Sequence, residues 1–229
     1  MKYTYLLIDF FTLLVPFVFS FHPKLAFYKN WKALFPAMLI TGTLYLLWDN
    51  YFTVLGVWGF NPNYLIDVYI GKLPIEEIAF FLCIPYSCIF TFHCLQIILK
   101  PVLPLNAVKV INVLLITGSV ILAICFRTQY YTLFTFLVLP VLIAISAYIL
   151  KASWLPTFYV VYAILLIPFL IVNGLLTGSC LAAPVVWYNN NRIIGIRLLT
   201  IPFEDIFYGM GLILLNMIIY MNLLKKQPA

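Results

Sequence analysis

Long apolar runs dominate the chain and restrict it to one class of fold. They predict helices at roughly 3–21, 33–50, 76–98, 109–126, 130–150, 154–174 and 204–224. A helix needs about 20 apolar residues to cross the hydrocarbon core of a bilayer, so runs of this length indicate seven transmembrane helices. Only 9% of the 229 residues are charged, whereas a soluble domain carries about a quarter. We therefore expect an all-α, polytopic membrane bundle with no sizeable soluble domain.

Two long loops, 51–73 and 175–201, each lead into a proline and a pair of acids. The first motif is Pro74-Ile75-Glu76-Glu77 and the second is Pro202-Phe203-Glu204-Asp205. Both loops carry a tryptophan and an asparagine in the same order, and each follows a helix that an asparagine is expected to close. These residues are Asn50, Trp58 and Asn61 in the first copy and Asn173, Trp187 and Asn189 in the second. Such similarity predicts an internal repeat of three helices.

The repeat predicts three segments along the chain. Residues 1–98 form the first three-helix repeat, 99–129 a linking helix and 130–229 the second repeat. Three spans move the chain to the other side of the membrane and the linking helix returns it, so the two repeats are parallel. Both acid pairs then lie at one membrane face, and a pseudo-twofold axis along the membrane normal would bring them to one cavity.

Lysine and arginine residues in the loops predict the orientation. The acid face carries Lys2, Lys72, Arg127, Arg192 and Arg197. The opposite face carries more, namely Lys24, Lys29, Lys32, Lys100, Lys109, Lys151, Lys225 and Lys226. The positive-inside rule therefore predicts a multi-pass protein of the cell inner membrane with a cytoplasmic C-terminus. The net charge of +6 suits contact with lipid headgroups and gives no indication of a nucleic-acid partner.

Four of the seven acids of the chain belong to the two motifs: Glu76, Glu77, Glu204 and Asp205. Proline and acids are also common at an ordinary helix N-terminus, but ionisable groups within a membrane are costly and are functional candidates by default. Phe80, Phe81 and Tyr208 each follow an acid by one helical turn. A protonated acid, a carboxylate and aromatic walls suit carbocation chemistry, because rings stabilise a cation. We predict that these acids act on an apolar polyene or isoprenoid from the bilayer.

Residues near the motifs are candidates for binding and supporting roles. For substrate binding we choose Trp58, Phe80, Phe81, Trp187 and Tyr208. The candidates that either hydrogen-bond the acids or serve as caps and loop residues are Asn50, Asn61, Asn173 and Asn189.

Three further groups of polar residues bear on the site. Arg197, like Arg192, either pairs with the second acid motif or contacts headgroups. Asp49, close to the first long loop, is a secondary acid candidate. No metal site is expected, because neither His22 nor His93 has another histidine or a cysteine at ligand spacing.

Both motif regions resemble the membrane-integral lycopene cyclases, small non-flavin enzymes of some bacteria, archaea and fungi. Some members consist of two three-helix subunits and others are tandem fusions. Three stretches of this chain resemble the first half-module of the family: Trp58-Gly59-Phe60-Asn61-Pro62, Gly71-Lys72-Leu73-Pro74-Ile75-Glu76-Glu77 and Phe80-Phe81. Three later stretches resemble the second half-module: Val186-Trp187-Tyr188-Asn189, Gly195-Ile196-Arg197 and the stretch from Ile201 to Met210.

The resemblance implies an enzyme of the intramolecular lyase or isomerase type. Its reaction would be ring closure at both open ends of lycopene, giving β-carotene by way of γ-carotene, and the four motif acids would carry it. No Gly-rich dinucleotide fingerprint follows a predicted strand, so we expect no cofactor. The expected partners are lycopene and other carotenoids from the bilayer and membrane lipids, with a homo-oligomer or an association with other carotenoid enzymes left open.

Two alternatives remain open from the sequence. One is another carotenoid end-group enzyme: an ε- or γ-cyclase, a cyclase of longer carotenoids, or a hydratase that captures the same cation with water. The other is a small membrane transporter, since internal repeats and intramembrane acids occur in transporters as well.

Overall fold

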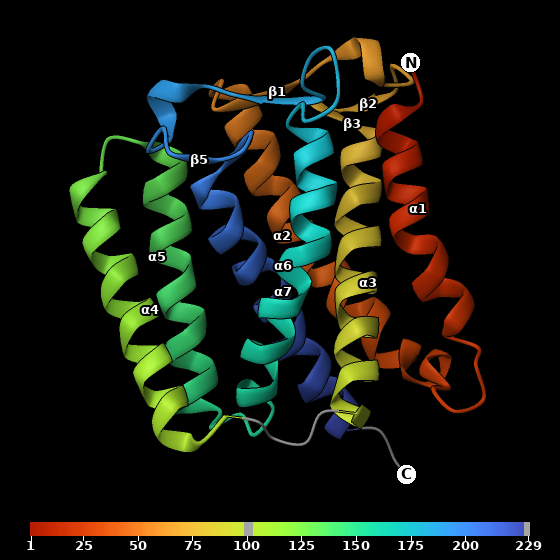
Figure 1. Cartoon of the computed structure of the whole chain (residues 1–229), viewed down its shortest axis with the longest axis vertical. Helices are drawn as coiled ribbons and strands as arrows, with labels where there is room; N and C mark the ends of the chain where they lie inside the picture. The colour runs from red at the N-terminus through yellow and green to blue at the C-terminus, as the bar shows by residue number, and fades with distance from the viewer. Residues whose placement is uncertain (99–102, 227–229) are drawn as a thin grey trace.

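The computed structural model describes residues 1–98 and 103–226, and this part of the chain forms a bundle of seven α-helices (Figure 1). They are α1 (Thr4–Phe19), α2 (Trp31–Val54), α3 (Ile75–Ile98), α4 (Leu105–Cys125), α5 (Tyr130–Ala144), α6 (Leu155–Leu176) and α7 (Phe203–Lys225). A π-helical segment, Ile145–Ile149, continues α5. The predicted all-α bundle is confirmed. The expected boundary between 98 and 99, and Lys100, lie outside the described residues.

Several helix ends differ from the prediction. α2 continues to Val54, about one turn past the expected end at Asn50. The extra turn carries Phe52, which is buried in the core, so packing extends the helix beyond the polar residues that were expected to end it. Asn50 therefore lies inside α2 and does not close it. α4 begins at Leu105, one turn earlier than expected.

Five helices of the described residues are long and apolar enough to cross a membrane: α3, α4, α5 with its π-helical segment, α6 and α7. α1 is apolar but has 16 residues, and α2 is outside this group. These helices make the chain a membrane protein. An arrangement with seven spans remains our proposal.

Three small antiparallel β-ribbons close one end of the bundle (Figure 1). β1 (Trp58–Phe60) pairs with β4 (Val186–Tyr188), and so joins the two long loops. β2 (Tyr69–Ile70) pairs with β3 (Leu73–Pro74), and β5 (Arg197–Leu198) pairs with β6 (Ile201–Pro202). β3 leads directly into α3 and β6 into α7, so the ribbons fix the first turns of the two helices that carry the acids.

The β1–β4 ribbon defines how the two halves correspond. The amide of Asn61 donates to the carbonyl oxygen of Val185 at 2.8 Å, and the amide of Asn189 donates to that of Val57 at 2.8 Å. In each bond an asparagine of one loop donates to a valine of the other loop, four residues before the other asparagine. Asn61 and Asn189 are therefore equivalent. Equivalent residues in these loops, and in α3 and α7, are therefore 128 positions apart (189 − 61).

This register corrects the pairing of the two loop tryptophans. Trp187 is equivalent to Gly59 and lies directly opposite it in the ribbon, whereas Trp58 is equivalent to Val186. The Trp187 indole covers Gly59 so closely that a Cβ there would lie 2.3 Å from Cζ2 of the ring. The expected equivalence of Trp58 and Trp187 is therefore one residue out of register.

A second correction concerns the asparagines that precede the loops. The carbonyl oxygens of Phe52 and Leu176 accept hydrogen bonds from the equivalent amides of Val57 and Val185. In α2 and α6, equivalent residues are therefore 124 positions apart (176 − 52). Asn173 thus corresponds to Asp49, and not to Asn50.

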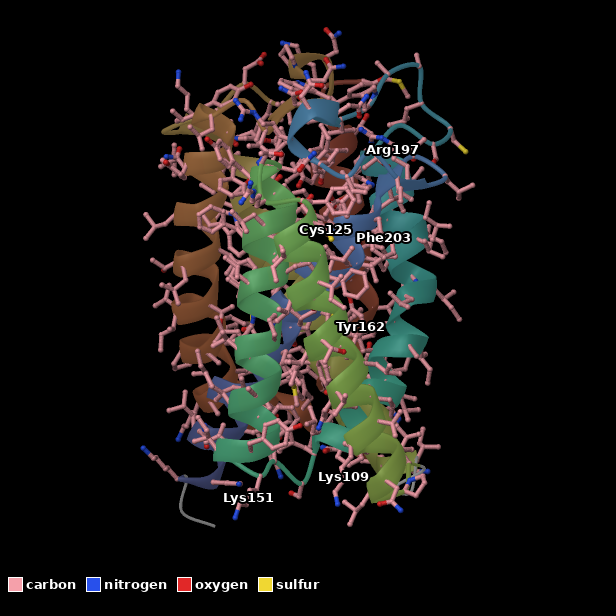
Figure 2. All side chains as sticks on the ribbon, turned by 90° about the vertical axis from the view of Figure 1, so that its left-hand side faces the viewer. Lys109, Cys125, Lys151, Tyr162, Arg197 and Phe203 are labelled. Carbon is pink, nitrogen blue, oxygen red and sulfur yellow. The ribbon has the colours of Figure 1, made fainter. Side chains whose placement is uncertain are left out.

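Positively charged side chains lie at both ends of the bundle. Figure 2 shows Arg197 at the end that carries the ribbons, and Lys109 and Lys151 at the opposite end. This placement agrees with the expected division of the loops into two faces. Which face is cytoplasmic stays a prediction.

Candidate active site

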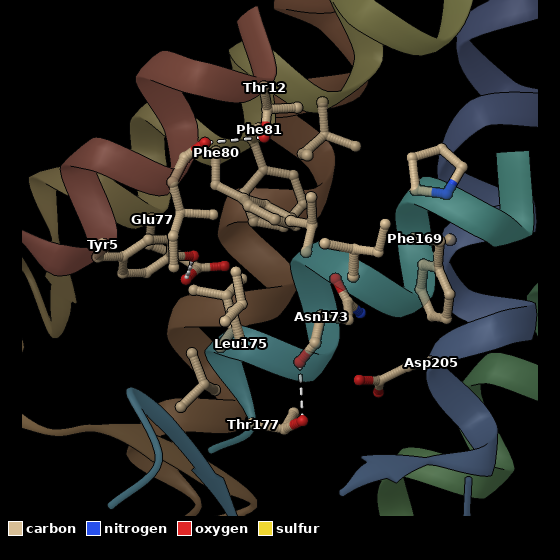
Figure 3. A pocket seen from close by; sticks show the side chains of 18 of the residues that line it. Tyr5, Thr12, Glu77, Phe80, Phe81, Phe169, Asn173, Leu175, Thr177 and Asp205 are labelled. Atoms are coloured by element: carbon tan, nitrogen blue, oxygen red, sulfur yellow. Dashed lines mark hydrogen bonds between the residues drawn. The ribbon is translucent and has the colours of Figure 1, made fainter. Parts of the chain in front are cut away.

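A cavity of about 710 Å³ brings together one acid from each repeat (Figure 3). Glu77, in the first turn of α3, and Asp205, in the first turn of α7, both line it. Both side chains are buried. The two acids are 128 positions apart, so they occupy equivalent positions in the two halves. The structure thus places both motifs at one chamber near the ribbon end of the bundle.

The other acid of each pair points away from the cavity and binds the preceding loop. Glu76 Oε1 accepts a hydrogen bond from the amide of Ile66 at 2.7 Å, and Glu204 Oε1 accepts one from the amide of Ile194 at 2.6 Å. Glu204 Oε1 also accepts from the hydroxyl of Thr132 at 2.5 Å. Neither Glu76 nor Glu204 lines the cavity. These two acids tie the long loops to the starts of α3 and α7.

Phenol groups hold the two acids that line the cavity. Tyr5 donates to Glu77 Oε2 at 2.5 Å, and Tyr131 donates to Asp205 Oδ1 at 2.6 Å. These tyrosines open the first helix of each repeat, at positions 126 apart (131 − 5). Tyr188 also donates to Asp205, to Oδ2 at 3.0 Å. Asp205 therefore accepts a phenol hydrogen at each oxygen, and Glu77 accepts one at Oε2.

Tyr188 remains a hydrogen-bond donor at neutral pH. It lies in the loop strand β4, where burial first, and the neighbouring Asp205 carboxylate second, raise the pKa of its phenol well above the usual value. Its equivalent in the first repeat is Phe60, which has no hydroxyl to donate. The site is therefore symmetric in backbone but asymmetric in hydrogen bonding.

A third carboxyl group, that of Asp49 on α2, also lines the cavity. It is buried, and its Oδ2 has no hydrogen-bond partner among the described residues. Its equivalent on α6, Asn173, lines the same cavity and is seen in Figure 3.

Five equivalent pairs thus surround the acid end of the chamber: Glu77 and Asp205, Asp49 and Asn173, Tyr5 and Tyr131, Phe60 and Tyr188, and Phe80 and Tyr208.

Aromatic rings form part of the remaining wall of the chamber. Trp58, Phe80, Phe81 and Tyr208, all singled out in the sequence, line the cavity. The ring centroids of Trp58 and Tyr131 are 5.0 Å apart, and those of Trp58 and Tyr208 are 6.5 Å apart. Aromatic rings therefore share the chamber with both acids, where a ring face can stabilise positive charge.

Five of the predicted supporting and binding residues lie outside this cavity, namely Trp187, Asn50, Asn61, Asn189 and Arg197. Trp187 is 43% exposed and covers Gly59. Asn50 Oδ1 accepts from the amide of Lys72 at 3.0 Å. Asn61 and Asn189 each accept from the amide two residues on, and so cap short 3₁₀ turns of the loops. These asparagines hold loop structure and do not contact the acids.

Pairing with the second acid motif, one of the two roles left open for Arg192 and Arg197, is not found among the described residues. Arg197 donates to the carbonyl oxygen of Thr200 and to Asn190 Oδ1, and Arg192 lies over the ring of Tyr130, 4.8 Å from its centroid. Among the described residues, the ion pair with charged atoms within 4.0 Å is the one between Lys2 and Asp67. The guanidinium of Arg197 is thus hydrogen-bonded within its own loop region.

The sequence analysis missed Tyr5, Tyr131 and Tyr188. Tyr5 and Tyr131 occupy equivalent places in the two predicted repeats, so a closer alignment of the first helices would have singled them out. Tyr188 gives no such signal, because its equivalent is Phe60 and its contact with Asp205 depends on the fold of the loop.

Comparisons with known proteins bear on what this arrangement does. A family model described as Lycopene cyclase matches residues 2–95 and 128–223. The two matched segments are the two repeats, and together they cover most of the chain. Searches of curated proteins and of solved structures gave no match. The chain belongs to the lycopene cyclase family.

Proposed function

We propose that this protein is a lycopene β-cyclase that closes β-ionone rings by proton-initiated carbocation chemistry. The observation that carries the proposal is the placement of Glu77 and Asp205, one from each repeat, on one largely apolar cavity. The reaction needs a proton donor, a proton acceptor and a wall that tolerates a cation. Each of these is provided by side chains of the chamber.

The hydrogen bonds favour different roles for the two acids. Asp205 accepts a phenol hydrogen at each oxygen, an arrangement that suits a carboxylate, because hydrogen bonds to the charged form favour it. Glu77 accepts one phenol hydrogen, at Oε2, which leaves Oε1 able to carry a proton towards the cavity. We assign Glu77 as the proton donor and Asp205 as the acceptor.

In the proposed reaction, Glu77 protonates the terminal double bond of the open end group. A double bond further along the chain attacks the resulting cation, and a carbon–carbon bond closes the ring. Asp205 then removes a proton from the ring carbon, which leaves the new double bond of the β-ionone ring. One proton enters and one leaves, so the product is an isomer, and return of the proton from Asp205 to Glu77 restores the starting state.

The aromatic wall protects and stabilises the cation between these two steps. Trp58, Phe80 and Tyr208 line the chamber next to the acids, and ring faces near a buried cation contribute about 2 kcal/mol each in favourable cases. A largely apolar chamber also limits capture of the cation by water. These features favour a cyclase over the hydratase alternative.

The test is pigment analysis of a bacterium that accumulates lycopene and expresses this chain. We expect chromatography to show β-carotene, with γ-carotene as the intermediate. Products with ε-rings or hydroxylated open ends would replace the β-cyclase assignment by one of the other end-group enzymes. Unchanged lycopene, with the protein present in the membrane, would contradict the proposed function.

A further inference from the structure

The cavity extends well beyond the acids and becomes a groove suited to a hydrocarbon chain. Its lining follows α3 from Glu77 to Thr91, which is 14 residues (91 − 77) or about 21 Å of helix. On the other sides it is lined by α1 as far as Pro16 and by α6 from Tyr162 onwards. The carboxyl groups therefore lie at one end of a long channel.

The hydroxyl groups along this channel are already bound to the backbone. Thr12 donates to the carbonyl oxygen of Ile8 at 2.8 Å, and Thr91 donates to that of Ser87 at 2.8 Å. Ser87 donates to the carbonyl oxygens of Thr12 and Cys83. With these hydrogens occupied, the channel offers methyl groups and apolar side chains, and a polar ligand would gain little by binding there.

The channel opens sideways between α1 and α6. Leu7 and Phe11 on α1 and Ile171 on α6 all line the cavity, yet they are 50%, 63% and 62% exposed, respectively. Side chains that are both cavity wall and outer surface mark an opening. Because this outer surface is apolar, it faces lipid in a membrane-spanning bundle.

The equivalent interface, between α2 and α5, is filled by aromatic rings. Trp48 and Phe52 on α2 and Phe134 on α5 form a cluster, with centroid distances of 5.7 Å between Trp48 and Phe52 and 5.5 Å between Phe52 and Phe134. From α2 and α5, the described residues that reach the cavity are Asp49 and Tyr131. Bulky rings therefore close this side of the chamber.

The open interface has small aliphatic residues at the three matching positions. By the offsets found above, Trp48 corresponds to Val172, Phe52 to Leu176 and Phe134 to Ile8. Val172, Leu176 and Ile8 all line the cavity. Three exchanges of an aromatic for an aliphatic side chain thus distinguish the open side from the closed side.

We propose that the polyene enters and leaves sideways from the bilayer, through the opening between α1 and α6, while the aromatic cluster of α2 and α5 keeps the equivalent side shut. This inference rests on the proposed function, since it takes an apolar polyene as the occupant. One end group then occupies the acid chamber at a time, with its chain along the channel. The second end of the same molecule reaches the acids only after the first has left.

The test installs the rings of the closed side at the open side, in the double variant Ile8→Phe/Val172→Trp. We expect lycopene conversion to fall by at least about tenfold, because the added rings fill the opening. The matched control is Ile167→Trp. Ile167 lies on α6, as Val172 does, but it is 66% exposed and does not line the cavity. It should keep conversion within about twofold, as surface substitutions do.

Equal amounts of folded protein, judged by gel filtration in detergent, are required for this comparison. If the double variant does not accumulate, the single variant Val172→Phe should show the same effect at about threefold. Unchanged conversion by the folded double variant, or by Val172→Phe in its place, would overturn the proposal.

A binding measurement separates this inference from the proposed function. Lycopene retained by purified protein is measured by its visible absorbance in the inactive Glu77→Gln background, with and without the two rings. Loss of retained lycopene only in the ring variant supports the opening even if cyclisation fails. Equal retention by both proteins contradicts it even if the wild type makes β-carotene.

The order of product formation tests the restriction to one end at a time. In vesicles with lycopene in large excess over protein, monocyclic product should form first and bicyclic product should follow after a lag. Bicyclic product without a lag would contradict the restriction.

Discussion

Glu76 and Glu77 are neighbours in the first turn of α3, and their side chains point about 100° apart around the helix axis. This angle sends Glu77 to the cavity and Glu76 to the amide of Ile66. The same division recurs in the second repeat, where Asp205 lines the cavity and Glu204 binds the amide of Ile194. We therefore expect one acid of each pair to act in catalysis and the other to position the loop.

Glu204→Gln tests the positioning role. The variant keeps a carbonyl oxygen that can accept from Ile194 and Thr132, but it places an amide group at Oε2, which is buried without a hydrogen-bond partner among the described residues. We expect a loss of about 1–3 kcal/mol of stability, with conversion retained to within about tenfold. Thermal unfolding in detergent and pigment analysis measure the two effects. A fully stable variant with no conversion would instead make Glu204 catalytic.

Tyr131→Phe and Tyr188→Phe test the hydrogen bonds that hold Asp205. Each removes a donor to one carboxylate oxygen, and a hydrogen bond to a charged group is worth about 1.5–3 kcal/mol. We expect each variant to slow conversion by at least about tenfold, measured as initial rates in vesicles. Tyr130→Phe, at a neighbouring residue that does not line the cavity, is the control. Wild-type rates in both cavity variants would mean that the phenols do not support Asp205.

At the scale of elements, the β1–β4 ribbon joins the two long loops at the end of the bundle that holds the acids. Its close packing depends on Gly59, because the Trp187 indole occupies the space that a side chain would need. Trp187 thus serves as a cover for the ribbon instead of a wall of the cavity. The ribbon in turn carries Trp58 and Tyr188, which do line it.

Gly59→Ala should therefore destabilise the protein. A Cβ 2.3 Å from the indole forces the ring or the ribbon to move, at a cost of about 1–3 kcal/mol. Gly118→Ala on α4 is the control, because a Cβ there has no neighbour within 4 Å. Addition of Trp187→Ala to Gly59→Ala should recover part of the loss. Equal melting temperatures of Gly59→Ala and the control would contradict the packing described here.

The elements could be predicted from the sequence to different degrees. The apolar runs located the helices, because length and hydropathy decide what spans a bilayer, and the repeated acid motifs located the site. The register was out by one residue at Trp187, since backbone pairing between distant loops leaves no local signal. The role of Tyr188 and the choice between the two roles left open for Arg197 also depend on loop geometry, which neither composition nor spacing reveals.

At the scale of the whole molecule, two similar halves build one asymmetric site. The equivalent backbone positions bring one acid from each half to the chamber, while differences such as Asn173 for Asp49 and Phe60 for Tyr188 give the two acids unequal surroundings. The same principle leaves one helix interface open and closes the other with aromatic rings. The two repeats thus provide equivalent backbone positions. Differences in a few side chains give the two acids different surroundings and leave one helix interface open.

The central claim is that Glu77 and Asp205 serve a single site, and pigment analysis of Glu77→Gln and Asp205→Asn, each expressed alone with lycopene, tests it most directly. If the two acids cooperate on every ring closure, each variant should leave lycopene unconverted although the protein is present and folded. If each half instead closed one ring with its own acid, either variant would still release a monocyclic carotene. Unconverted lycopene from both variants is the result we predict, and monocyclic product from either one would contradict the account.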